Sequence, residues 1–327
     1  MSSFSMDRLP VAGLLAFLLL PILSIEIGDA TTGAPAEEYW KSALPNNTPM
    51  PASLSRLIRG RSSVNNGYDK SATKAQLRKA CGIYNRYEKS ATEEQMQQHH
   101  AAGVALFFLE SDIQPGKKLT LHFMPAYVAG EKFLPRGEAD AIPFSSDKIP
   151  EILSRFSLSP GSAEAAEVAE TLRDCERPAA KGERKACATS LESMVDFAVS
   201  GLGTSHVRVT STAVVAGGKE DSFQKQEYTV AGVKRASAAA GAQRLVVCHA
   251  EPYAYAVFSC HLARATRAYT VSVVGEDGTA AEAAAVCHTD TAGWNPKHLA
   301  LQMLNVKPGT VPVCHFLPQN DVVWARS

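Results

Sequence analysis

Four Cys-His dipeptides in the last quarter of the chain are the residues whose types and spacing could do chemistry. They are Cys248-His249, Cys260-His261, Cys287-His288 and Cys314-His315, and ten, twenty-five and twenty-five residues separate them. Imidazole and thiolate groups are ligands that several transition metals prefer. Thiols in an oxidising compartment pair as disulfides instead. The recurrence therefore predicts disulfides, a metal site or both.

Each dipeptide ends a short apolar run that is typical of a β-strand. Adjacent side chains of a strand point to opposite faces, so a cysteine and the histidine beside it would lie on different sides. We expect the sulfurs to form bridges on one face and the imidazoles to be available on the other. The candidate metal ligands are then His249, His261, His288 and His315. Four imidazoles suit Cu(II), with zinc as the competitor; the alternative is that each histidine is a structural residue beside a disulfide.

The chain has seven cysteines, so one remains when the others pair. Cys175 and Cys187 lie at the end of one predicted helix and just before the next, where they could close their own disulfide. So short a loop would contribute on the order of 3 kcal/mol. The other four candidates can pair in three ways, and the spacing does not choose among them: Cys248, Cys260, Cys287 and Cys314. Cys81 is left over as a free, buried or intermolecular thiol.

The first 105 residues differ in character from the rest. Residues 11–25 form an apolar run that is shorter than the roughly 20 residues needed to span a bilayer, and small residues follow at Gly28 and Ala30. We therefore predict a signal peptide over residues 1–30, secretion, and no membrane span after cleavage. Residues 31–105 have too few large apolar residues for an independent core, so we expect a flexible N-terminal segment. It contains one glycosylation sequon at Asn46, although Pro49 follows it.

From residue 106 onward the pattern is that of one domain, residues 106–327. Apolar runs near residues 104–109 and 119–123 read as strands. Helical patterns fill about 145–202, with predicted N-caps at Ser146, Ser162 and Thr189. Beyond residue 203 short apolar runs alternate with turns. Helices segregated from strands along the chain predict an α+β fold with a β-rich C-terminal half.

Charge and motif content exclude several functional classes. The chain has 33 basic and 33 acidic residues, which argues against a dedicated nucleic-acid binder. It has no Gly-x-Ser-x-Gly nucleophile elbow, no phosphate-binding glycine loop and no His-Glu-x-x-His zinc motif. Hydrolase and nucleotide-dependent functions therefore lack support.

The spacing Cys-His-x10-Cys-His-x25-Cys-His-x25-Cys-His resembles the signature of the plant BURP-domain family. Other blocks are similar to family segments: residues 107–110, 133–136, 142–146, 187–193, 287–291 and 294–298. The resemblance covers residues 106–327, and Tyr39-Trp40 followed by Leu44-Pro45 is similar to the dehydration-responsive subgroup. It implies a secreted apoplastic or cell-wall protein linked to stress and development. It also implies copper bound by the four histidines of the Cys-His pairs.

The resemblance leaves open whether the chain is an enzyme. A first hypothesis is a non-enzymatic extracellular protein whose domain holds copper. A second is a copper-dependent autocatalytic cyclase that cross-links Trp or Tyr side chains of a core peptide. In residues 31–105 no repeat is present, and the aromatic candidates are Tyr39, Trp40, Tyr68, Tyr84 and Tyr87. A third is a protein that binds an acidic cell-wall polymer through the basic excess of residues 31–105. His298 would be a structural residue or would orient a ligand imidazole.

Overall fold

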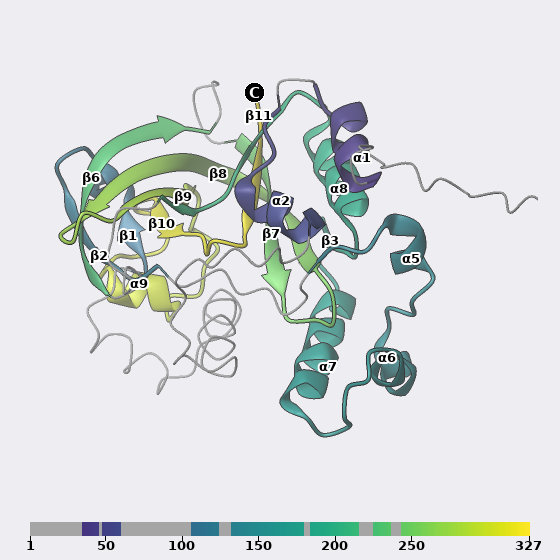
Figure 1. The fold of residues 1–327 in the computed structure, drawn as a ribbon. Coiled ribbons are helices and arrows are strands. Elements are labelled where there is room, and N and C mark those ends of the chain that lie inside the picture. Colours follow the sequence, from purple (N-terminus) through teal and green to yellow (C-terminus); the bar gives the residue numbers. More distant parts are fainter. Residues whose placement is uncertain are drawn as a thin grey trace, which may run out of the picture. The chain divides into compact units, whose positions relative to one another are not determined.

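One long strand organises the β-rich half of the chain. The computed structural model describes residues 35–45, 48–59, 106–123, 132–179, 184–215, 225–236 and 243–327. The first half of β8 (Val257–Gly275) pairs with β7 (Gln243–Glu251) and β3 (Lys185–Ala188). Its second half pairs with β6 (Gln226–Arg235) and β9 (Ala280–His288) (Figure 1). Between the halves Ala265 has a φ of 49°, and its carbonyl accepts a hydrogen bond from the Thr289 N–H. This left-handed residue interrupts the regular strand where the pairing partners change.

The sheet has eleven strands among the described residues, and all of their pairings are antiparallel. Its main path runs β1-β10-β9-β8-β7-β11-β4. The strands not yet bounded are β1 (Phe108–Leu109), β2 (Lys118–Leu121), β4 (Val207–Thr210), β5 (Ala213–Val215), β10 (Val313–Phe316) and β11 (Val322–Arg326). Within this path β7, β8 and β9 form a meander, because antiparallel strands need only short connections. The neighbours β1-β10, β7-β11 and β11-β4 are not consecutive in the chain.

Helices precede most of the strands, so the predicted α+β class is confirmed. They are α5 (Arg136–Asp140), α6 (Ile149–Arg155), α7 (Ala163–Glu176) and α8 (Leu191–Leu202), with the 3-10 turns η1 (Glu110–Ile113) and η2 (Ser146–Lys148); α9 (Leu299–Met303) follows later. Ser162 caps α7 as predicted. The other two caps lie one residue from the predicted ones: Ser145 caps η2, and Ser190 caps α8 through a reciprocal pair with Ser193. Ser190 takes this role because it has the extended backbone that an N-cap requires.

The largest apolar cluster lies between α8 and the sheet. The buried face of α8 carries Leu191, Met194, Val195, Ala198 and Leu202, spaced by three or four residues as one helix face requires. A Cβ atom on Gly201 would lie 3.0 Å from Cγ2 of Val246 on β7, so the glycine allows helix and strand to approach closely.

Two helices from the N-terminal segment complete this cluster: α1 (Pro35–Ala43) and α2 (Ala52–Arg59). Trp40 is buried, with its ring centroid 5.4 Å from that of Trp324, and its Nε1–H donates to the carbonyl of Thr48. Leu54 of α2 is fully buried. We expected residues 31–105 to be flexible because they cannot build a core alone. The described part of this segment is instead helical because it packs into a core that α8 and β11 supply.

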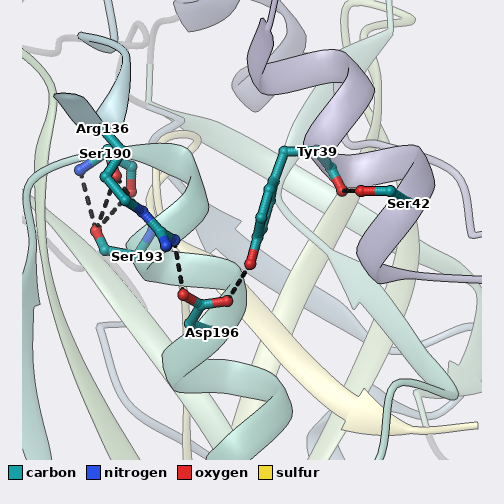
Figure 2. A network of polar contacts seen from close by, with 6 residues as sticks. All are labelled: Tyr39, Ser42, Arg136, Ser190, Ser193 and Asp196. Carbon is teal, nitrogen blue, oxygen red and sulfur yellow. Dashed lines mark hydrogen bonds and ion pairs between the residues drawn. The ribbon is translucent and has the colours of Figure 1, made fainter. Parts of the chain in front are cut away.

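A polar network on the surface also joins α1 to α8 (Figure 2). The Tyr39 hydroxyl donates to Oδ1 of Asp196, and Arg136 donates to Oδ2 of the same carboxylate at 2.6 Å. The Arg136 guanidinium also lies 5.2 Å from the centroid of the Tyr39 ring. The hydrogen bond to Asp196 raises the pKa of Tyr39 above its ordinary value. Tyr39 and Arg136 therefore share one carboxylate at the surface where α1 packs on α8.

The described residues contain three disulfides: Cys175–Cys187, Cys248–Cys260 and Cys287–Cys314. The first is the bridge predicted from the sequence, and the other two are one of the three connectivities left open. The predicted signal peptide over residues 1–30, the sequon at Asn46 and the leftover Cys81 lie outside the described residues. Among the described helices, none combines the length and the apolar character needed to cross a bilayer.

Candidate metal site: two histidine pairs

Strand pairing places the cysteines of the four dipeptides directly opposite one another. Cys248 on β7 is the register partner of Cys260 on β8, and Cys287 on β9 is the partner of Cys314 on β10. Each opposed pair forms a disulfide, and all four sulfur-bearing residues are fully buried. The two disulfides therefore cross-link neighbouring strands within the sheet.

The histidines follow the cysteines and so occupy the other face of the same strands. In each strand pair both imidazoles lie on that face, offset diagonally: His249 is opposite Ser259, and His261 is opposite Val247. Each histidine has an apolar residue two positions away along the chain, and all four of these residues belong to one apolar cluster. They are Val247, Ala263, Val286 and Leu317. Because side chains two apart in an extended segment share a face, all four imidazoles lie on the side of the sheet that carries this cluster.

The first histidine pair is held at short range. Nε2 of His249 lies 3.2 Å from Nε2 of His261, and the ring planes are inclined by only 14° with centroids 5.4 Å apart. The centroids are much farther apart than the facing nitrogens, so the rings meet edge to edge. On its other side, Nδ1 of His249 lies 2.7 Å from Oδ2 of Asp321. His249 and Asp321 are both buried. The two Nε2 atoms of the pair thus face each other at short range, with a carboxylate behind the ring of His249.

The second histidine pair has aromatic surroundings. The rings of His288 and His315 are nearly parallel, at 15°, with centroids 5.6 Å apart. Nδ1 of His315 lies 3.3 Å from the carbonyl oxygen of Phe316. Trp294 lies edge-on to His288 with centroids 5.3 Å apart, and Phe107 lies edge-on to His315 at 6.3 Å. This pair therefore lies among aromatic rings.

His298 has a structural role in this region. It is the N-cap of α9, where its Nδ1 accepts a hydrogen bond from the Ala300 N–H at 3.2 Å. Its ring packs against Trp294 with centroids 4.4 Å apart. Of the two roles expected for His298, the capping contact supports the structural one. Through Trp294 the residue also helps to shape the surroundings of the second histidine pair.

The nitrogen atoms of one histidine pair are close enough to bind the same metal ion. Imidazole nitrogens bind zinc at about 2.0–2.1 Å, so two Nε2 atoms 3.2 Å apart can both reach one ion of this kind. A carboxylate on the far nitrogen of a ligand histidine is the usual arrangement around protein-bound metals. Over the described ranges, no group of three or more His, Cys, Asp or Glu side chains is placed to hold a metal ion. The four histidines thus form two imidazole pairs in this structure.

Sequence reasoning missed Asp321. It lies in the polar run Gln319-Asn320-Asp321 between β10 and β11, and all three residues are buried. Three consecutive polar residues between two apolar strands are a weak signal that they have polar partners inside the protein. The partner of Asp321 could not be read from the sequence because it lies 72 residues away.

Comparisons with known proteins found one family model and several relatives. The sequence model of the BURP domain matches residues 106–326. BURP domain-containing protein 3 of Oryza sativa is 71% identical over 231 residues, which are 71% of this chain and 53% of that protein. BURP domain-containing protein 5 of the same species is 51% identical over 89% of this chain and 86% of its own length. BURP domain protein RD22 of Arabidopsis thaliana is 50% identical over 70% of this chain and 57% of its own length. The chain thus spans about half the length of some of these relatives.

Proposed function

The chain belongs to the BURP-domain family, and on this premise we propose that it is a secreted, copper-binding protein of the plant apoplast or cell wall that acts in stress responses or development. One observation carries the copper proposal: the Nε2 atoms of His249 and His261 face each other at 3.2 Å, with Asp321 behind His249. Two imidazole nitrogens that are close enough to share one ion form a donor set that copper accepts.

In this proposal His249 and His261 hold one ion, and His288 and His315 provide a second pair of imidazoles. The disulfides Cys248–Cys260 and Cys287–Cys314 keep the paired strands in register, so they hold each histidine beside its partner. Bound copper would supply one-electron redox chemistry that no side chain performs alone. The protein's contribution is to orient the rings and to bury His249 and His315 away from solvent.

The three disulfides support the placement outside the cell. Disulfides form and persist in oxidising compartments and are rare in the cytosol. In the cytosol these six cysteines would be reduced. The strand pairs β7–β8 and β9–β10 would then lose their covalent links. Secretion through the predicted signal peptide over residues 1–30 would supply the oxidising environment that these bridges need.

Copper binding is tested by titrating the purified full chain with Cu(II) in a calorimeter and measuring bound metal after dialysis. We expect the wild type to retain copper and the His249→Ala, His288→Ala double variant to lose it. The matched control is His206→Ala, because His206 is exposed and far in sequence from the four Cys-His pairs. Equal copper content in the wild type and the double variant would overturn the proposal.

A copper-dependent peptide cyclase is the second candidate function, and the paired imidazoles are the observation that favours it. Trp40 is a poor substrate, since it is buried against Trp324 and its Nε1–H is bonded to Thr48. The other candidates are Tyr39, whose hydroxyl donates to Asp196, and Tyr68, Tyr84 and Tyr87, which lie outside the described residues. Incubation with Cu(II) and oxygen, then digestion, should show a peptide about 2 Da lighter for each cross-link. Unchanged masses over residues 31–105 would refute self-cyclisation.

A further inference from the structure

We infer that Asp321 is a positioning residue for His249: it holds the imidazole proton on Nδ1 and so directs the bare Nε2 atom toward His261. The expected effect of Asp321 on copper affinity rests on the proposed copper function. The hydrogen bonding on which the inference is built belongs to the protein without metal.

Strand register brings Asp321 to this place. Strand β11 pairs with β7 so that Val322 is opposite Cys248. In an antiparallel pair, the residue before Val322 is then level with the residue after Cys248. Asp321 therefore lies beside His249 because of the same register that places Val322 beside the disulfide.

Both oxygens of the Asp321 carboxylate have a donor. Oδ1 accepts the Ala250 N–H at 3.0 Å, which fixes the orientation of the carboxylate, and Oδ2 lies 2.7 Å from Nδ1 of His249. The second distance is that of a charge-assisted hydrogen bond. An ionised carboxylate only accepts hydrogen bonds, so the contact requires a proton on Nδ1 of His249.

A neutral imidazole that carries its proton on Nδ1 has a lone pair on Nε2. In this structure that atom faces Nε2 of His261 at 3.2 Å. The lone pair accepts a hydrogen bond from His261 in the metal-free protein, and it is the pair that a metal ion needs. If the proton moved to Nε2, His249 could not act as a ligand through that atom.

The variant Asp321→Asn tests this role with almost no change in shape. Its amide oxygen can still accept the Ala250 N–H, which turns the NH2 group toward Nδ1 of His249. An NH2 group only donates, so Nδ1 must then accept and the proton must move to Nε2. Removing an outer partner of this kind typically lowers metal affinity about 10- to 100-fold. We expect a loss of this size for Cu(II).

The closing experiment separates the inference from the proposed function. Nitrogen-15 NMR of histidine-labelled, metal-free full-length protein reports which ring nitrogen of His249 carries the proton. We expect Nδ1–H in the wild type and Nε2–H in Asp321→Asn. The control is Asp277→Asn, since Asp277 also accepts a backbone N–H, that of Thr279 at 2.8 Å, but lies in the turn between β8 and β9. We expect this control to leave the His249 signal and the copper affinity unchanged.

An Nε2–H signal for His249 in the metal-free wild type would overturn the inference, and this result does not depend on whether any variant folds. Equal copper affinities of the wild type and Asp321→Asn would also overturn it. A wild type that binds no copper but shows the expected change of tautomer would refute the proposed copper function and would support the positioning role of Asp321.

Discussion

Replacing Trp40 with alanine tests whether α1 is part of the folded domain. Trp40 is 4% exposed, and it packs against Trp324, which is fully buried. Truncation of a buried tryptophan typically costs about 3–5 kcal/mol, which includes the lost transfer free energy and the cavity left behind. The variant also removes the hydrogen bond from Nε1 to the Thr48 carbonyl. We therefore expect Trp40→Ala to lower the free energy of unfolding by about 3–5 kcal/mol.

Urea denaturation of the wild type and the variant, followed by far-ultraviolet circular dichroism, measures this difference. The matched control is Glu38→Ala on the same helix, because Glu38 is exposed. A surface change of this kind should stay within about 0.5 kcal/mol of the wild type. If Trp40→Ala is as stable as the Glu38→Ala control, the cluster between α1 and α8 does not contribute to folding, and the reasoning fails.

Three other expectations concern single features of the domain. Replacing both Cys248 and Cys260 with alanine removes a cross-link with a sequence separation of 12 and should cost about 3 kcal/mol in urea denaturation; an unchanged midpoint would contradict this. Burial raises the pKa of Tyr255 to about 12, so stability should fall as the pH rises from about 10 toward 12, because unfolded phenols ionise first. Tyr255→Phe should show a shallower fall, and identical slopes would contradict the assignment. Hydrogen bonds from the side chain and backbone of Ser146 lower the pKa of Glu176, so this carboxylate stabilises the protein above its unfolded pKa of about 4.3 and loses that effect as the pH falls. Glu176→Gln should weaken the acid dependence of unfolding between about pH 5 and 3, and an unchanged profile would argue against this contact.

The N-terminal segment shows where composition misleads. Counting large apolar residues predicts that residues 31–105 cannot build a core alone, since hydrophobic stabilisation scales with the area that is buried. Composition says nothing about apolar surface that another part of the chain offers. Trp40 and Leu54 are buried in a cluster whose other members come from α8 and the C-terminal strands. The helices of this segment are stable because of that shared core.

The sequence likewise predicted one disulfide pairing and left the other two open. The bridge between Cys175 and Cys187 was predictable because both residues lie near the ends of elements that follow one another closely. The partners of Cys248 and Cys287 were not predictable, because they depend on which strands pair and in which register. Register is set by contacts between residues far apart in the chain, and these have no local signature.

By itself, the sequence determined the family, the α+β class, the oxidised framework and the four histidines as candidate ligands, because motif spacing, periodicity and strand alternation are local properties of the chain. Only the tertiary structure decided that His249 meets His261, that His288 meets His315, and that Asp321 lies behind His249. Each of these contacts requires two strands in one register. Which strands pair depends on the burial of the whole sheet and on no single segment.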